Sequence, residues 1–362
     1  MTVESPLHTV HEQLGASFTD FAGWNMPVRY ESELAEHKAV RETAGIFDLS
    51  HMAEIEITGS EVGEMLDHAF VGNFSNLRVG RARYSLLCDS DGGILDDLIT
   101  YRLDDERYLV VANAANADVA LTALRERAES FDADVSDENS AYALIAVQGP
   151  NASSIVGPLS DADLTELKYY GIVPSVVAGQ EVRLARTGYT GEDGFELYCT
   201  PGQAQPLWHA LVEAGEPYGL QPAGLACRDT LRLEAGMPLY GNELSTATTP
   251  FETNLDRLVK FEKRAEFVGK EALAKRQENP TGQVLVGLRG SGKRAPRNGY
   301  RVLSGDTDIG VITSGTLSPT LGYPIAIASI DSSHSEPGTT LSVDVRGRAH
   351  EVEVVALPFY KR

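Results

Sequence analysis

Two neighbouring carboxylates, Asp96 and Asp97, lie inside an otherwise apolar stretch, ILDDLITY, that the sequence predicts to be a β-strand. Side chains alternate between the two faces of a strand, so Asp97 shares one face with Ile99 and Tyr101, and Asp96 lies on the other. The two acids therefore do not form a paired-carboxylate dyad, and at most one faces any given pocket. An acid within a strand usually marks a sheet edge, a turn partner or a site, so a structural and a functional interpretation both stay open.

Two further charged residues stand among apolar neighbours. Glu196 lies in the predicted strand GFELY, and Arg228 lies in ACRDTLRLE, a predicted helix of mixed character. Taken alone, each is more often a member of a structural ion pair than a ligand contact.

Common nucleotide and metal motifs are absent or incomplete. The segment GLRGSGKR at 287–294 has the spacing of a phosphate loop, but it ends in Arg294, and the following Pro296 and Gly299 preclude a helix. A basic surface turn is the better interpretation. His8 and His11 are three residues apart, but the eight histidines do not cluster at metal-ligand spacing, so we expect no metal.

The elements that must position these residues follow from periodicity. Helices are predicted at 31–44 (with an apolar stripe of Leu34, Ala35, Ala39 and Val40), 61–69, 115–131, 206–219 and 228–233. Residues 45–59 read as extended, with Ile55 and Ile57 on one face and the glutamates on the other. Residues 84–103 read as a hairpin that turns at Asp89–Gly93, and further strands are expected at 106–113, 142–150 and twice within 179–198. Residues 50 to 138 thus form a compact α+β unit, and residues 281 to 362 a small all-β barrel or sandwich.

Composition excludes several classes of function. The 362 residues carry 31 basic and 52 acidic side chains, a formal charge of −21, which disfavours a general nucleic-acid or anionic-lipid binder. Three scattered cysteines and an N-terminus without signal-peptide character fit a reduced, cytoplasmic setting. No apolar run approaches the length of a membrane span.

Charge is unevenly distributed along the chain. From Arg257 to Arg301 there are 12 basic and 4 acidic residues, a net charge of +8, so the other 317 residues carry −29. Such asymmetry predicts a local site for an anionic ligand or partner, although a solvated basic face explains it about equally well.

Many motifs then agree in order and spacing with one family. They are FAGWNMPVRY (21–30), AVRETAGIFDLSHM (39–52), GGILDD (92–97), VANAAN (111–116), LIAVQGP (144–150), RTGYTGEDGFEL (186–197), PAGLACRDTLRLEAGMPLYG (222–241), FVGKEAL (267–273) and ITSGTLSPTLGYPIAIA (312–328). From about residue 6 to Tyr360 the chain resembles the aminomethyltransferases of the glycine cleavage system, the T-proteins.

The resemblance implies a fold and an activity. The expected fold is α+β, a three-domain cloverleaf with a discontinuous folate-binding domain (1–50 and 139–280), an inserted α+β domain (51–138) and a C-terminal β-barrel domain (281–362). The expected reaction moves the methylene of the aminomethyl group on the lipoyl arm of the H-protein to tetrahydrofolate, a co-substrate, and releases ammonia. It leaves methylene-tetrahydrofolate and dihydrolipoyl H-protein.

The resemblance also implies roles for individual residues. Asp97 matches the family's key catalytic aspartate, and Glu196 and Arg228 match the acid of the pterin site and the folate-binding arginine. Residues matching other positions of the folate site are Tyr101, Met52, Tyr84, Val111, Asn113, Tyr170, Tyr189 and Tyr360.

Other functions on this fold remain as alternatives. A tetrahydrofolate-dependent demethylase of a small methylated compound is poorly separated by sequence, because its pocket chemistry is similar. A non-enzymatic folate-binding factor for iron–sulfur assembly would carry a Lys-Gly-Cys motif, and the corresponding KFEKRAEFVGKEAL has no cysteine. The folate domains of sarcosine and dimethylglycine dehydrogenases belong to much longer chains with a dinucleotide fingerprint.

The basic segment gains an interpretation from this resemblance. H-proteins of the system are typically acidic, and an enzyme of charge −21 would repel them unless one face were basic. We therefore expect Lys263, Arg264, Lys293, Arg294 and Arg297 to help dock the H-protein.

Overall fold

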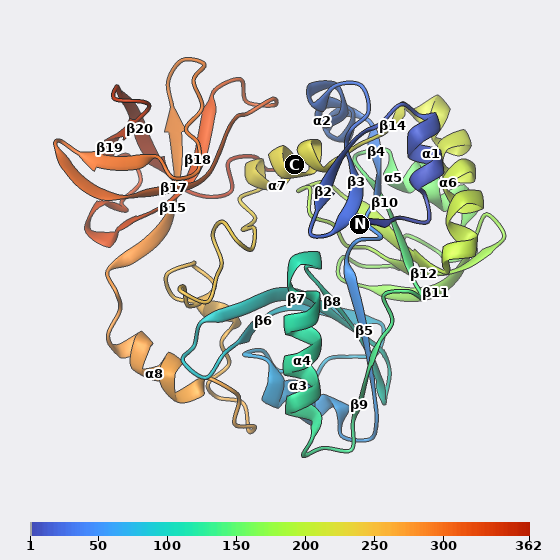
Figure 1. The fold of residues 1–362 in the computed structure, drawn as a ribbon. Helices are drawn as coiled ribbons and strands as arrows, with labels where there is room; N and C mark the ends of the chain where they lie inside the picture. Colours follow the sequence, from blue (N-terminus) through green and yellow to red (C-terminus); the bar gives the residue numbers. More distant parts are fainter. Residues whose placement is uncertain (1) are drawn as a thin grey trace. The chain divides into compact units, whose positions relative to one another are not determined.

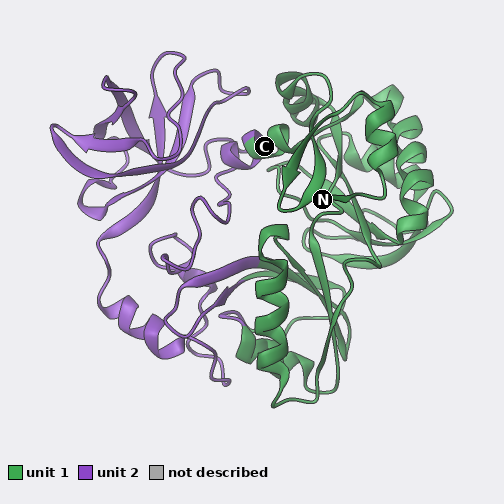
Figure 2. Cartoon of the chain, in the orientation of Figure 1, with its two compact units in different colours: residues 1–69, 73–85, 98–229 green, residues 70–72, 86–97, 230–362 purple. Residues whose placement is uncertain are grey.

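The computed structural model describes residues 2–362, and the chain divides into two compact units. Unit 1 comprises the residues up to 69 together with 73–85 and 98–229, and unit 2 comprises 70–72, 86–97 and 230–362 (Figure 2). The units are described separately below.

The larger sheet of unit 1 has six strands (Figure 1). In spatial order these are β11 (Ile172–Val177), β12 (Gln180–Ala185), β13 (Gly194–Cys199), β10 (Ala143–Gln148), β4 (Ala44–Asp48) and β14 (Leu220–Pro222). β11 to β4 pair antiparallel and β14 pairs parallel to β4. A small sheet of β1 (Val3–Glu4), β3 (Trp24–Arg29) and β2 (Ser17–Phe21) also belongs to this unit.

Helices bury one face of the six-stranded sheet. They include α1 (His8–Gln13), α5 (Ala152–Val156) and α6 (Pro201–Gly215), whose apolar residues join those of the strands in one core. Trp208 of α6 belongs to this core and is 1% exposed. A capping box between Thr200 and Gln203 starts α6, with Pro201 in the first turn, because these side chains satisfy backbone N–H groups that the helix leaves unpaired.

Helix α2 (Glu33–Glu42) forms where the sequence predicts it, but one residue of its predicted apolar stripe is placed wrongly. Leu34 is 58% exposed, whereas Glu36 is buried. The Glu36 carboxylate accepts the backbone N–H groups of Tyr30, at 2.7 Å, and Gly224, at 2.9 Å. These partners lie outside the helix, so its own periodicity could not reveal that an acid faces inward.

The second sheet has five strands, as the α+β unit near 50–138 requires. In order they are β6 (Arg81–Cys88), β7 (Ile94–Asp104), β8 (Arg107–Ala112), β5 (Ala53–Thr58) and β9 (Asp134–Asp137), accompanied by α3 (Val62–Ala69) and α4 (Ala117–Ala128). The predicted hairpin turn is confirmed, since the N–H of Asp89 donates to the carbonyl of Gly93 at 2.8 Å. Along β7, Asp96 is fully buried and Asp97 half-buried, which confirms that the two acids face opposite sides.

Glu54 on β5 is a buried acid whose carboxylate accepts no hydrogen bond from the described residues. It pairs in register with Val111 of β8, and it is 1% exposed. Neither carboxylate oxygen has a hydrogen-bond partner among the described residues. Burial, and to a smaller extent the nearby charge of Asp137, raises the pKa of Glu54 well above its usual range.

This raised pKa predicts how stability depends on pH. A carboxyl whose pKa is raised by folding stabilises the folded state below its unfolded pKa, and that contribution is lost as pH rises towards the folded pKa. We therefore expect Glu54→Gln to leave stability nearly unchanged at pH 4.5 and to raise it by roughly 1–3 kcal/mol at pH 8. Thermal unfolding of both proteins across that range measures the difference.

Glu56→Gln is the matched control, because the Glu56 carboxylate on the same strand pairs with Arg107 at 2.6 Å and should gain nothing. Parallel pH profiles for wild type and Glu54→Gln would contradict the expectation.

Unit 2 is dominated by the C-terminal barrel, and the predicted mixed architecture with a barrel at this end is confirmed. Its closed order is β15 (Gln283–Gly290), β18 (Pro324–Asp331), β17 (Thr307–Leu317), β16 (Arg301–Ser304), β19 (Thr340–Asp344) and β20 (Ala349–Val355). Valine and isoleucine side chains fill its interior. Helix α7 (Leu225–Glu234) leads into this unit and α8 (Lys270–Glu278) precedes the barrel. The three-domain division stays a prediction.

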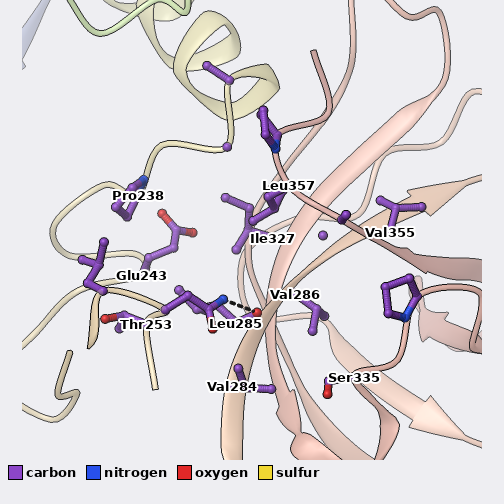
Figure 3. Close-up of a pocket in the computed structure, with 18 residues that line it drawn as sticks. Pro238, Glu243, Thr253, Val284, Leu285, Val286, Ile327, Ser335, Val355 and Leu357 are labelled. Atoms are coloured by element: carbon purple, nitrogen blue, oxygen red, sulfur yellow. Dashed lines mark hydrogen bonds between the residues drawn. The ribbon is translucent and has the colours of Figure 1, made fainter. Parts of the chain in front are cut away.

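A buried ion pair anchors the end of α7 within unit 2. Arg232 donates to Glu243, with 3.0 Å between the guanidinium nitrogen and the carboxylate oxygen, and to the Ser314 hydroxyl at 2.8 Å. A cavity of about 540 Å³ lies beside this pair, walled largely by Leu285, Ile327 and Leu357 (Figure 3). None of the predicted site residues lines it, so it does not locate the site.

Candidate functional site

Glu196 lies at the centre of a buried hydrogen-bonded cluster in unit 1. It sits on β13, paired in register with Ala146 of β10 and Ala185 of β12. Its carboxylate accepts from the Thr187 hydroxyl and from the Tyr101 hydroxyl, the latter at 3.3 Å. The Tyr101 oxygen is 2.9 Å from the Thr187 hydroxyl and accepts from the Tyr198 hydroxyl at 3.2 Å. The structure thus brings the predicted Tyr101 and Glu196 together.

The environment of this carboxylate pulls its pKa in two directions. Burial raises the pKa of Glu196, while hydrogen bonds from Thr187 and Tyr101 and the charge of Arg228 lower it, and the balance lies above the usual range. Burial, followed by nearby groups that include Glu196, raises the pKa of Tyr101 and of Tyr198 well above the usual range. Both phenols therefore remain protonated donors.

Arg228 lies in the first turn of α7. Its guanidinium stacks over the Tyr189 ring, 4.9 Å from the ring centroid. Burial lowers the pKa of Arg228, while Tyr189 and Glu196 raise it. A guanidinium remains charged in proteins, so Arg228 supplies a cation whose charge acts on the Glu196 carboxylate.

The loop between β12 and β13 holds Thr187 and Tyr189 in place around one buried side chain. The amide nitrogen of Gln148 donates to the Thr187 carbonyl at 3.0 Å, and its amide oxygen accepts from the Thr190 hydroxyl at 2.9 Å. A Cβ at Gly188 or Gly194 would lie 2.0 or 2.4 Å from a Gln148 side-chain atom. With Gln148 in place, a side chain at either position would therefore clash, and a Cβ at Gly194 would also lie 2.6 Å from the Val147 carbonyl oxygen.

Two arginines hold the same loop in shape, Arg186 from within the loop and Arg41 from α2. Arg186 grips Asp193 through two nitrogens, at 2.9 and 2.5 Å, and Arg41 donates to the Thr190 carbonyl and to Glu192. The bidentate Arg186–Asp193 pair fixes orientation as well as position. The loop is thus built to hold its polar side chains against β13.

The remaining predicted site residues of unit 1 lie on neighbouring elements. Val111 is buried on β8, and Tyr170 has a left-handed backbone, with φ at 63°. Burial raises the pKa of Tyr170, with smaller contributions from Tyr169 and Glu196. Half-buried positions are held by Met52, between β4 and β5, by Tyr84 on β6, and by Asn113, before the short helix Ala114–Asn116.

Asp97 and Tyr360 belong to unit 2. Asp97 lies on β7 four residues before Tyr101, at the unit boundary. The backbone N–H of Tyr360 donates to the carbonyl of Glu234 at 2.8 Å, which ties the C-terminal segment to the end of α7.

Sequence reasoning missed Thr187 and Tyr198. Both lie within or directly beside the motif RTGYTGEDGFEL, but a hydroxyl residue in a loop or strand gives no sign of which carboxylate it will reach. The pairing of β13 with β12 and β10 supplies that information.

Two features are absent from residues 2–362. No group of three His, Cys, Asp or Glu side chains there is arranged to hold a metal ion. In that same range, none of the helices combines the length and apolar character needed to span a membrane.

Comparison with known proteins gives a family. Residues 7–263 match the GCVT N-terminal domain, and residues 283–361 match the glycine cleavage T-protein C-terminal barrel domain. An aminomethyltransferase of Saccharopolyspora erythraea is 60% identical over 99% of this chain and 98% of its own, and one of Bacillus subtilis is 42% identical over the whole of both. The crystal structure of the glycine cleavage system aminomethyltransferase T from Bartonella henselae matches with a TM-score of 0.93 and 35% identity, covering 100% and 99% of the two chains.

The fold is therefore that of a two-part protein with a GCVT N-terminal domain and a T-protein barrel. With relatives of this identity over its full length, the chain belongs to the family of glycine cleavage T-proteins.

Proposed function

We propose that this chain transfers the methylene of the aminomethyl group on lipoylated H-protein to tetrahydrofolate, with release of ammonia. That it is an aminomethyltransferase of the glycine cleavage system follows from the full-length relatives. The substrates and the residues that handle them are the proposal, and the buried Glu196 cluster is the observation that carries it.

The donor set of the cluster fits a folate. The edge of a pterin ring carries adjacent N–H donors, and one carboxylate accepts two of them. Thr187 and Tyr101 donate hydrogen bonds to the Glu196 carboxylate. These hydrogen bonds orient the carboxylate and favour its charged form. Arg228, 4.9 Å above the Tyr189 ring, binds an acceptor oxygen of the ligand, either the ring carbonyl or a carboxylate of the tail.

Asp97 is proposed as the catalytic residue of the transfer. The folate supplies the nitrogen nucleophile that receives the carbon. A carboxylate beside that nitrogen orients it, stabilises the positive charge that develops and accepts a proton. Asp97 is half-buried and lies on the same face of β7 as Tyr101, which supports this assignment.

One assay tests the proposed reaction. Ammonia release from aminomethylated H-protein is measured with and without tetrahydrofolate, and we expect a strong acceleration by the folate. A lack of acceleration, together with demethylation of a small methylated amine or thioether, would favour the demethylase alternative.

One residue of the predicted docking surface is placed wrongly. Lys263 is 6% exposed, because its ammonium donates to the carbonyls of Phe70, at 2.5 Å, and Gly72, at 2.6 Å, and lies over the Phe267 ring. The Lys263 ammonium therefore binds carbonyl oxygens inside unit 2 and is not available on the surface to dock a partner. Arg264, Lys293, Arg294 and Arg297 are exposed, and the last three lie between β15 and β16.

This exposed turn makes a prediction about H-protein. Reversing charge with Lys293→Glu and Arg294→Glu together should raise the KM for H-protein roughly tenfold at low salt, because two exposed attractions become repulsions. The effect should shrink at high salt, and the affinity for tetrahydrofolate should stay the same. Steady-state kinetics at two ionic strengths measure both.

The matched control reverses Arg346 and Arg348, which are equally exposed in the turn between β19 and β20 and change the net charge by the same amount. If both double variants raise KM equally, or neither does so at low salt, the basic turn is merely a solvated surface.

A further inference from the structure

His51 is a buried histidine in the turn between β4 and β5, directly before the predicted site residue Met52. It is 3% exposed, and its Nδ1 atom has no hydrogen-bond partner among the described residues. A buried ring nitrogen without a partner is costly to fold, so its presence calls for an explanation.

The protein around His51 keeps the imidazole uncharged. Burial lowers the pKa of His51 to about 3, helped by the charge of Arg228 from α7 and opposed by Asp48 from β4. The Phe21 ring meets the imidazole edge-on, with 5.3 Å between centroids. A neutral imidazole offers one N–H donor and one acceptor nitrogen.

The acid whose charge acts on this histidine, Asp48, has other hydrogen-bond partners. The Asp48 carboxylate is occupied by His11, at 2.8 Å, by the Ser5 hydroxyl and by the backbone N–H of Ser50, at 2.9 Å. His11 in turn contacts the Tyr30 hydroxyl at 3.0 Å. Asp48 therefore belongs to a closed network that leaves His51 outside.

Arg228 connects His51 with the Glu196 cluster. Its guanidinium lies over the Tyr189 ring, 4.9 Å from the centroid, and its charge lowers the pKa of both His51 and Glu196, so both residues lie within range of the same cation in unit 1. A guanidinium attracts an acceptor oxygen, and an uncharged N–H donor beside it can bind the same oxygen without adding a second charge.

We propose that His51 is a further ligand-binding residue of the folate site, whose neutral imidazole donates a hydrogen bond from Nδ1 to the acceptor oxygen that Arg228 also binds. This inference rests on the proposed folate site. The oxygen belongs either to the 4-oxo group of the pterin or to a carboxylate of the glutamate tail. In the first case His51 is a specificity residue for the oxo form of the ring.

The test compares His51→Phe, which keeps the size of the ring without its nitrogens, with His51→Asn, which restores a donor. Equilibrium binding of tetrahydrofolate should weaken roughly 10- to 100-fold in His51→Phe and recover to within about fivefold of wild type in His51→Asn. Thermal unfolding shows whether each variant is folded under the conditions of the titration.

Two analogues assign the oxygen. If it is the ring oxygen, a 4-amino analogue should bind wild type and His51→Phe alike, while a tetrahydropteroate that lacks the glutamate tail still distinguishes them. If it is the tail carboxylate, the tetrahydropteroate should bind wild type and His51→Phe alike, while the 4-amino analogue still distinguishes them.

Wild-type affinity for tetrahydrofolate in folded His51→Phe would overturn the inference, and so would equal loss of affinity in the Phe and Asn variants. If the wild-type chain itself fails to bind tetrahydrofolate, the proposed function fails first, and the two failures are therefore distinguishable.

Discussion

Replacement of Asp97 by asparagine is expected to lower kcat for ammonia release by roughly 10²- to 10⁴-fold while tetrahydrofolate still binds. The amide keeps the size of the side chain, but it neither accepts a proton at neutral pH nor stabilises a developing positive charge. The measurement combines tetrahydrofolate-dependent turnover of aminomethylated H-protein with equilibrium folate binding by the same preparation.

Asp96→Asn is the internal control for this experiment. Asp96 adjoins Asp97 but is fully buried on the opposite face of β7, so its loss should lower the melting temperature more than kcat. Full turnover by Asp97→Asn would remove Asp97 from the mechanism, and an equal loss of kcat in both variants would point to damage of the strand.

Glu196→Gln should weaken tetrahydrofolate binding about 100-fold. A glutamine amide has one acceptor oxygen and presents N–H groups where the carboxylate has a second acceptor, so one of two charge-assisted hydrogen bonds is lost and the other weakened. Isothermal titration of the folded variant measures the change. Glu181→Gln, an exposed acid on the neighbouring β12, is the matched control and should bind like wild type.

The same carboxylate gives the binding a pH dependence. Because the pKa of Glu196 is raised, mainly by burial, the charged form that accepts the ligand's N–H groups is lost at a higher pH than for an exposed glutamate. Wild-type affinity should therefore fall as the pH is lowered towards the acid range, and Glu196→Gln should show a flat profile there. A flat wild-type profile would mean that Glu196 does not meet the ligand as a carboxylate.

Local patterns predicted much of the fold. The turn from Asp89 to Gly93, the opposite faces of Asp96 and Asp97, and the β-rich C-terminal region depend on neighbours a few residues apart, which the sequence displays directly. Family motifs pointed to the acid and the arginine of the candidate site, and in the structure the Arg228 charge lowers the pKa of Glu196.

Long-range partners account for what was missed. Glu36 faces inward because it binds a backbone N–H 188 residues away, and Lys263 is buried by carbonyls more than 190 residues away. Thr187 and Tyr198 reach the Tyr101–Glu196 pair only after the strands assemble. No periodicity within a helix or strand records such distant contacts.

The loop wrapped around Gln148 has a consequence for how this family can vary. Its two glycines, at 188 and 194, face the same amide, so a change at any one of these three positions alters the room left for the others. Homologues should therefore vary there in concert: alanine at 188, where the nearest atoms all belong to the Gln148 side chain, should occur with a shorter residue at 148, and Gly188→Ala should be rescued by shortening Gln148. Substitutions at positions 148, 188 and 194 are therefore expected to be correlated among homologues.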